Sequence, residues 1–138
     1  MRVRYQENLL YKDLAYQVVG CFYNVYNELG PGYKESIYHK ALAIQLKDNK
    51  INFTEKQQLS ISYHDKKIGI YTPDFIIDGK IIVELKAVDF MPKIYEKQLY
   101  TYLKGTKYKL GYLVNFCSDK IDIRRRIYET ARKNANSR

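Results

Sequence analysis

The sequence predicts a single α/β domain over residues 1–138, in which helices flank a central mixed β-sheet. Three observations favour this fold class. Apolar residues recur at helical spacing in the first third of the chain. From about residue 51 the period changes to two, as in paired strands. A helical segment, a buried strand and a basic amphipathic segment then follow, which gives the order helix, helix, strands, helix, strand, helix.

Two helices are expected before the strands. The first spans residues 7–29, where apolar side chains are three or four residues apart: Leu10, Leu14, Val18, Phe22, Val25 and Leu29. Gly30 suits a left-handed helix cap, and Pro31 prevents the helix from continuing. The second helix is expected over residues 34–47.

The remaining elements are predicted by period and by turn residues. Alternating residues 59–63 lead through a turn at 65–67 into a second strand, and strands at 73–77 and 80–87 join through Asp78 and Gly79. A helix over about 92–104, a buried strand over 108–116 and a basic amphipathic helix over about 119–133 follow. The basic tail at about 130–138 is expected to fray.

The charge of the chain narrows its partners. A formal net charge of +9 favours polyanions, and therefore nucleic acid, near the surface. The alternative is a composition rich in Lys, Ile, Asn and Tyr, as an AT-rich genome encodes. No apolar run reaches the ~18 residues of a membrane span, and the first ten residues do not resemble a signal peptide. We therefore expect a cytoplasmic protein without membrane contact.

Charged residues interrupt the apolar strands around Asp78. Glu84 and Lys86 lie two residues apart, so their side chains leave the same face of a strand. A salt bridge from Glu84 to a basic residue is the ordinary explanation. Asp74 adds a second carboxylate across the hairpin, and two close negative charges are costly unless a cation lies between them. Carboxylate oxygens suit Mg²⁺, and Lys86 would orient the attacking water or neutralise a phosphate oxygen.

The loop between these strands decides whether the two carboxylates meet. A two-residue turn would place Asp74 opposite Val83, pointing away from the face of Glu84. A three-residue loop, such as residues 77–79, or an equivalent bulge places Asp74, Glu84 and Lys86 on one face. Because a metal site requires both carboxylates, we predict the odd loop.

Three motifs resemble those of known nucleases. Pro73-Asp74 followed by Glu84-Leu85-Lys86 resembles the signature of the PD-(D/E)XK nuclease superfamily. Residues 32–38, GYKESIY, resemble the GxxExxY signature, whose family is similar to a PD-(D/E)XK branch. Residues 98–102, QLYTY, resemble the QxxxY element of RecB-like exonucleases. The resemblance covers about residues 8–130 and implies a restriction-endonuclease-like α-β-β-β-α-β core with an extra N-terminal helix.

Carried over by position, the resemblance implies a metal site. Asp74, Glu84 and the backbone carbonyl of Leu85 would hold the metal, and Lys86 would be the catalytic lysine. Glu35 would support the metal directly or through water. Without the resemblance, Glu35 is a first-turn glutamate that interacts favourably with the helix dipole.

The resemblance also implies contacts with the substrate. Gln98 would approach Lys86 or a phosphate, and Tyr102 would bond a phosphate or stack on a base. A packed core tyrosine is the alternative for Tyr102. The expected last helix carries three arginines that form either part of a DNA-facing patch or a solvated face: Arg124, Arg125 and Arg126.

The implied function is hydrolysis of DNA phosphodiester bonds by a Mg²⁺-dependent nuclease through a metal-activated water, with Mn²⁺ as a substitute. DNA is expected over RNA. The alternative is a module of the same fold with little or no catalysis, which binds nucleic acid or a protein partner. Endo- or exonucleolytic action and homo-oligomerisation are left open.

Overall fold

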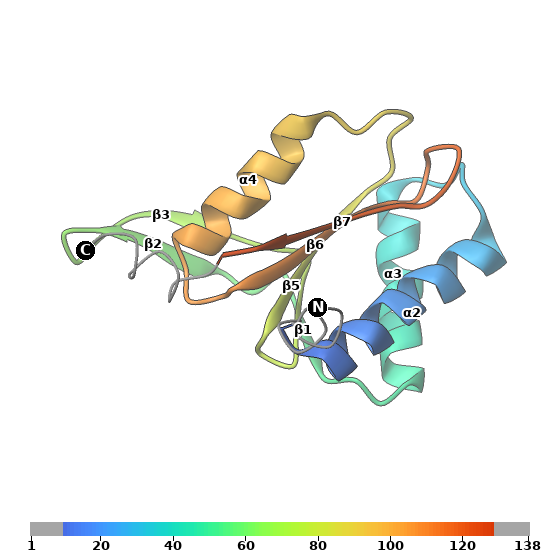
Figure 1. The fold of residues 1–138 in the computed structure, drawn as a ribbon, viewed down its shortest axis with the longest axis horizontal. Helices are drawn as coiled ribbons and strands as arrows, with labels where there is room; N and C mark the ends of the chain where they lie inside the picture. The colour runs from blue at the N-terminus through green and yellow to red at the C-terminus, as the bar shows by residue number, and fades with distance from the viewer. Residues whose placement is uncertain (1–9, 129–138) are drawn as a thin grey trace, which may run out of the picture.

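The computed structural model describes residues 10–128 (Figure 1). In chain order the elements are α2 (Lys12–Leu29), α3 (Glu35–Asp48), β1 (Phe53–Glu55), β2 (Leu59–Tyr63), β3 (Lys66–Tyr71), β4 (Phe75–Ile77), β5 (Ile81–Lys86), α4 (Lys93–Lys104), β6 (Leu110–Asn115) and β7 (Asp122–Ile127). Residues 7–9 of the expected first helix and the expected frayed tail at 130–138 lie outside the described residues. No helix within residues 10–128 is both long enough and apolar enough to cross a membrane.

The predicted α/β fold class is confirmed. Five strands form a mixed sheet in the order β1-β4-β5-β6-β7, in which β5 and β6 are parallel and the other neighbours antiparallel. Helices α2 and α3 cover one face of this sheet, and α4 covers the other (Figure 1). The element order agrees with the expected α-β-β-β-α-β core preceded by an N-terminal helix.

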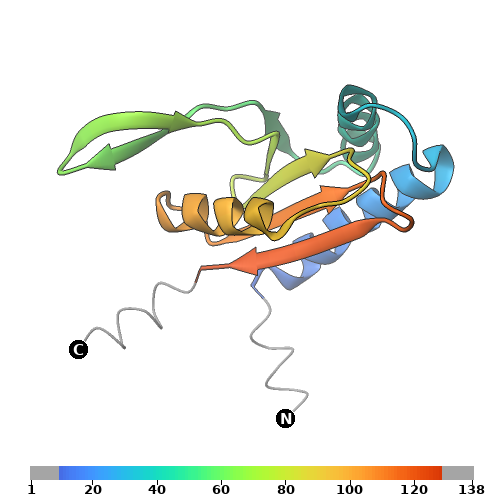
Figure 2. The same cartoon turned by 90° about the horizontal axis from the view of Figure 1, so that it is seen from above.

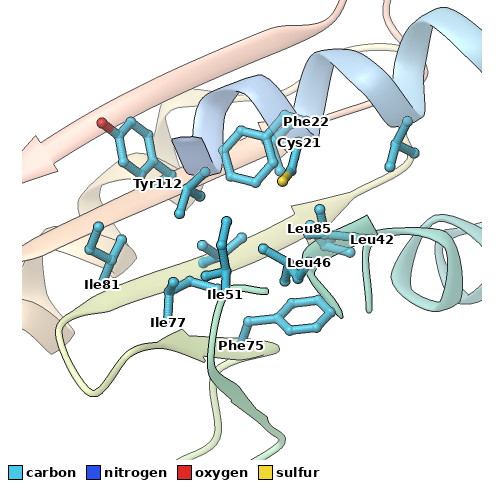
Figure 3. Close-up of a cluster of buried hydrophobic side chains, with 14 of the residues drawn as sticks. Cys21, Phe22, Leu42, Leu46, Ile51, Phe75, Ile77, Ile81, Leu85 and Tyr112 are labelled. Carbon is cyan, nitrogen blue, oxygen red and sulfur yellow. The ribbon is translucent and has the colours of Figure 1, made fainter. Parts of the chain in front are cut away.

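Alternate residues of β5 face different helices. Ile81, Val83 and Leu85 belong to the core under α2 and α3, whereas Ile82 belongs to the core under α4. Figure 3 shows the first core, where side chains from both helices meet the sheet: Cys21, Phe22, Leu42 and Leu46. Because both faces are covered, apolar residues run continuously along the strand, and a charged residue within it needs a partner.

Strands β2 and β3 form a separate two-stranded sheet rather than a continuation of the main one. Their turn lies at His64 and Asp65, one residue before the expected one, and both residues have positive φ (49° and 63°), as a two-residue hairpin turn requires. The hairpin extends away from the main sheet (Figure 2). Its last residue, Tyr71, is buried against α4 and β5.

The basic amphipathic helix expected over about residues 119–133 is wrong for residues 119–128, the part of it that the structure describes. Asp122–Ile127 form β7, which pairs antiparallel with β6 at the edge of the sheet. Apolar Ile123 packs into the core under α2, while Arg124 on the opposite face reaches Glu96 of α4. A strand satisfies both contacts because its side chains alternate between faces. The run of arginines hid that alternation in the sequence.

Tyr38 organises the connection between α2 and α3. Its side chain is fully buried, and its hydroxyl donates to the Gly30 carbonyl at 2.5 Å and accepts from the Tyr33 N–H at 3.2 Å. Its ring stacks on Phe116, with 4.7 Å between centroids. These contacts fix the loop that places Glu35 at the first residue of α3.

Tyr38→Phe tests this anchoring role. Removing the hydroxyl leaves the Gly30 carbonyl and the Tyr33 N–H without this partner, so we expect the free energy of unfolding to fall by about 1–2 kcal/mol. Urea denaturation measures the loss. Tyr16→Phe is the control, because Tyr16 is 82% exposed and its change is expected to stay within about 0.5 kcal/mol. Equal stability of the two variants would contradict the role.

Candidate active site

The β4–β5 hairpin brings Asp74 and Glu84 together. Ile77 pairs with Ile81, so three residues, 78–80, form the connection, and the predicted odd loop is confirmed. It consists of residues 78–80 rather than 77–79. The reason is that Asp78 and Gly79 both adopt positive φ (51° and 64°) and make the tight turn, which leaves Lys80 as the extra residue. The register continues to place Asp74 beside Glu84 on the α4 side of the sheet.

Asp74 is buried, and both of its carboxylate oxygens have partners. The backbone N–H of Leu85 donates to Oδ2 at 2.8 Å. The Lys56 ammonium donates to Oδ1 at 2.5 Å and forms a salt bridge with it. The backbone N–H of Asp74 donates in turn to Glu84 Oε1 at 3.3 Å. These bonds hold the end of β4 against β5 at the point where the two carboxylates meet.

Glu84 is half-buried, and its other carboxylate oxygen accepts a hydrogen bond from the Tyr71 hydroxyl at 2.5 Å. Burial, together with the neighbouring charge of Asp74, raises the pKa of the Glu84 carboxyl to about 7, while the hydrogen bond from the Tyr71 hydroxyl lowers it. Burial and the Glu84 charge raise the pKa of the Tyr71 hydroxyl as well. The surroundings of Asp74 and Glu84 therefore do not fully compensate the negative charge that the two carboxylates would carry together.

Lys86 and α4 form the wall beside these carboxylates. Lys86 lies on the face of Glu84, with its ammonium 4.3 Å from the centroid of the Tyr95 ring. A cavity of about 40 Å³ lies between Glu84, Lys86, Gln98 and Tyr102. Gln98 and Tyr102 of α4, which the sequence predicted at the site, therefore line the same cavity as Glu84 and Lys86.

A family comparison identifies this arrangement. A model of the PD-(D/E)XK nuclease superfamily matches residues 12–127, which include Asp74, Glu84 and Lys86. The chain belongs to the PD-(D/E)XK nuclease superfamily. The match is made at the level of the superfamily, so membership of the GxxExxY branch stays a prediction.

Two solved structures are similar to this superfamily member. The crystal structure of SSO0001 has 26% sequence identity and a TM-score of 0.50, over 99% of this chain and 67% of that chain. An alkaline exonuclease (LHK-Exo) from Laribacter hongkongensis has 16% identity and a TM-score of 0.48, over 69% of this chain. The match spans 56% of the length of the exonuclease chain. Among curated proteins, no relative matches the sequence.

The donor set suits the divalent metal that the superfamily implies. Asp74 and Glu84 offer hard oxygen atoms, and the raised pKa of Glu84 shows that added positive charge would be favourable there. Glu35 is exposed at the start of α3, and burial, followed by the charge of Asp74, raises its pKa while Lys86 and Lys56 oppose the rise. Within residues 10–128, however, no three His, Cys, Asp or Glu side chains form a group that could hold a metal. Mg²⁺ usually keeps several water ligands and is held by one or two carboxylates, rather than by protein ligands on all sides. The pair of Asp74 and Glu84 suits such a site.

Two residues at this site were missed from the sequence. Lys56 follows β1 and reaches Asp74, and Tyr71 ends β3 and reaches Glu84. The ring of Tyr71 also stacks on Tyr102, with 3.9 Å between centroids, so Tyr102 has one face covered by protein. No motif in the sequence marks Lys56 or Tyr71.

The three predicted DNA-binding arginines do not form one patch. Arg124 donates to Glu96 at 2.6 Å and to Asp122 at 2.7 Å, and Arg126 forms a salt bridge with Glu96. Arg125 lies on the opposite face of β7, in a groove beside α2. The expectation that these arginines lie on a helix is wrong, because this segment is a strand whose alternate residues face different layers.

Glu84→Gln tests the origin of the raised pKa. Between about pH 4.5 and pH 7 the folded state retains the Glu84 proton and the unfolded state releases it. The free energy of unfolding of the metal-free protein therefore falls as pH rises through this window, by up to about 3 kcal/mol. Glutamine does not ionise, so the variant is expected to gain stability relative to wild type from pH 5 to pH 8.

Urea denaturation in EDTA at each pH measures this difference. Glu28→Gln, at an exposed position on α2, is the control and is expected to follow the pH dependence of wild type. If Glu84→Gln also ran parallel to wild type, the raised pKa would be refuted.

Proposed function

We propose that this superfamily member is a nuclease that hydrolyses DNA phosphodiester bonds with Mg²⁺, or with Mn²⁺ in its place. The observation that supports the proposal is the pairing of Asp74 with Glu84 across β4 and β5, with Lys86 on the same face. Membership of a nuclease superfamily supports a role for these three residues in phosphodiester hydrolysis.

The proposed roles are those that the family resemblance implies for these residues. Asp74, Glu84 and the Leu85 carbonyl would hold the cation, and Glu35 would support it directly or through water. The bound cation would supply charge to neutralise the phosphate and to activate water. Lys86 would neutralise a phosphate oxygen or orient the water that attacks phosphorus as the bond to the leaving oxygen breaks.

Contacts from α4 would position the substrate. Gln98 is exposed beside Lys86, where its amide can reach a phosphate. Tyr71 covers one face of Tyr102, which favours a phosphate contact through the Tyr102 hydroxyl over stacking on a base. The net charge of +9 favours a polyanion, and the resemblance of QLYTY to an element of RecB-like exonucleases favours action on strand ends or single strands of DNA.

A second candidate function is a nucleic-acid-binding module with little catalysis. The salt bridge between Lys56 and Asp74 favours this binding module. In it, an ammonium of the protein itself neutralises a carboxylate that a nuclease would offer to a metal ion. Such a module would bind DNA equally well with and without a chelator. A nuclease would stop cleaving DNA when a chelator removes its metal.

Lys86→Met tests the nuclease. The variant keeps a long unbranched side chain and removes the ammonium, so we expect cleavage of single- or double-stranded DNA in Mg²⁺ or Mn²⁺ to slow by about 10²-fold or more. Initial rates measured on labelled DNA give the effect. Lys12→Met is the matched control, because Lys12 is exposed on α2, which covers the other face of the sheet.

The outcomes separate the two candidates. A nuclease gives cleavage that EDTA abolishes, that Lys86→Met slows and that Lys12→Met leaves unchanged. Equal rates for wild type and Lys86→Met would indicate a contaminating enzyme. Chelator-insensitive DNA binding without cleavage would establish the binding module instead.

A further inference from the structure

Lys56 places a cation at one carboxylate of the candidate metal site. It follows directly after β1, and its ammonium lies 2.5 Å from Asp74 Oδ1. The Lys56 side chain is 58% exposed, whereas that of Asp74 is 7% exposed. A solvent-facing ammonium therefore neutralises a buried carboxylate that the Leu85 backbone also holds.

The charge of Lys56 acts on more than Asp74. The hydrogen bond that the Lys56 ammonium donates to Asp74 is the main cause of the raised pKa of Lys56, and the charges of Asp74, Glu35 and Glu84 raise it as well, whereas burial lowers it. The three carboxylates are those proposed to bind or support the metal. The Lys56 ammonium thus lies where their fields converge, as a bound cation would.

The backbone at Lys56 also serves this placement. Its N–H donates to the Asp74 carbonyl at 3.1 Å, which extends the β1–β4 ladder by one residue. Its φ is +54°, in the left-handed region that favours glycine over residues with a side chain. This unfavourable backbone conformation occurs at the residue whose side chain contacts Asp74.

A divalent cation and this ammonium compete for one oxygen atom. Mg²⁺ binds carboxylate oxygen at about 2.0–2.1 Å, so it would occupy the space beside Oδ1 that the Lys56 ammonium fills. Their positive charges also repel each other at this range. Because most of the Lys56 side chain faces solvent, it can leave Asp74 without disturbing the core.

We propose that Lys56 is a built-in counter-ion, a positioning residue that holds the carboxylates of the metal-free site and is displaced from Asp74 when a divalent cation binds. This inference rests on the proposed function, because it requires that the site accept a metal. It predicts that removing the ammonium lowers the stability of the metal-free protein, because Asp74 loses its counter-charge. The same change raises the affinity for a divalent cation, because the cation no longer competes with Lys56. An ordinary structural salt bridge would not raise metal affinity when broken.

Lys56→Met separates these cases, and Lys50→Met is its control. Lys50 also has a positive φ (58°), is exposed and carries the same charge. It lies beyond the far end of the 14-residue α3, whose first residue is Glu35, and a helix of that length spans about 21 Å. That distance exceeds the ~8 Å Debye length in physiological salt.

Mn²⁺ binding is measured without nucleic acid, by titration calorimetry and by the electron paramagnetic resonance of free Mn²⁺. We expect Lys56→Met to bind Mn²⁺ at least about tenfold more tightly than wild type, and Lys50→Met to stay within about twofold of it. In thermal unfolding, Lys56→Met is expected to melt below wild type in EDTA and to gain more than wild type from Mn²⁺.

Each result decides a different point. Equal Mn²⁺ affinity for wild type and Lys56→Met, or weaker binding by Lys56→Met, would overturn the counter-ion role and leave the metal-dependent nuclease intact. Absence of Mn²⁺ binding by both would overturn the counter-ion role and the proposed metal dependence together. If Lys56→Met does not fold, Lys56→Gly provides the same comparison with Lys50→Gly, because glycine accepts the positive φ at both positions.

Discussion

The structure around the site depends on the register between β4 and β5. The extra residue in the 78–80 loop places Asp74 and Glu84 on the same face of the sheet. A shift of one residue would turn Asp74 toward the core that Phe75 and Val83 fill under α2 and α3. That core would then contain a carboxylate without a partner, so packing and the candidate chemistry specify the same register.

The carboxylates in this register are unfavourable in the absence of compensating charge. Asp74 has a backbone N–H and the Lys56 ammonium, and Glu84 has the Tyr71 hydroxyl and the Asp74 N–H. These bonds satisfy the oxygen atoms, yet the pKa of Glu84 remains raised by burial. A site that retains such a deficit of positive charge is suited to binding a cation or a catalytic proton.

The rest of the fold holds this pair at the boundary between the two layers of helices. Tyr38 fixes the loop that starts α3, and Leu99 and Leu103 anchor α4 so that Gln98 and Tyr102 face the site. The basic character of the chain is partly used internally, because Glu96 pairs with two arginines of β7. Net charge alone therefore overstates the surface that is available to a polyanion.

The sequence by itself determined the features that depend on local period and spacing. Helical spacing located α2, α3 and α4 to within a few residues, and the need for both carboxylates on one face predicted the odd loop beside Gly79. The same reasoning placed Asp74, Glu84 and Lys86 on one face, and the family resemblance added Gln98 and Tyr102 of α4; the roles of these residues are proposals.

Only the tertiary structure decided the features that depend on distant contacts. Residues 122–127 form a strand because the edge of β6 and Glu96 of α4 offer partners that no local pattern reveals. Lys56 and Tyr71 reach carboxylates 18 and 13 residues away, respectively. Periodicity shows which face a residue occupies, but an ion pair between separate elements forms only where packing brings their ends together.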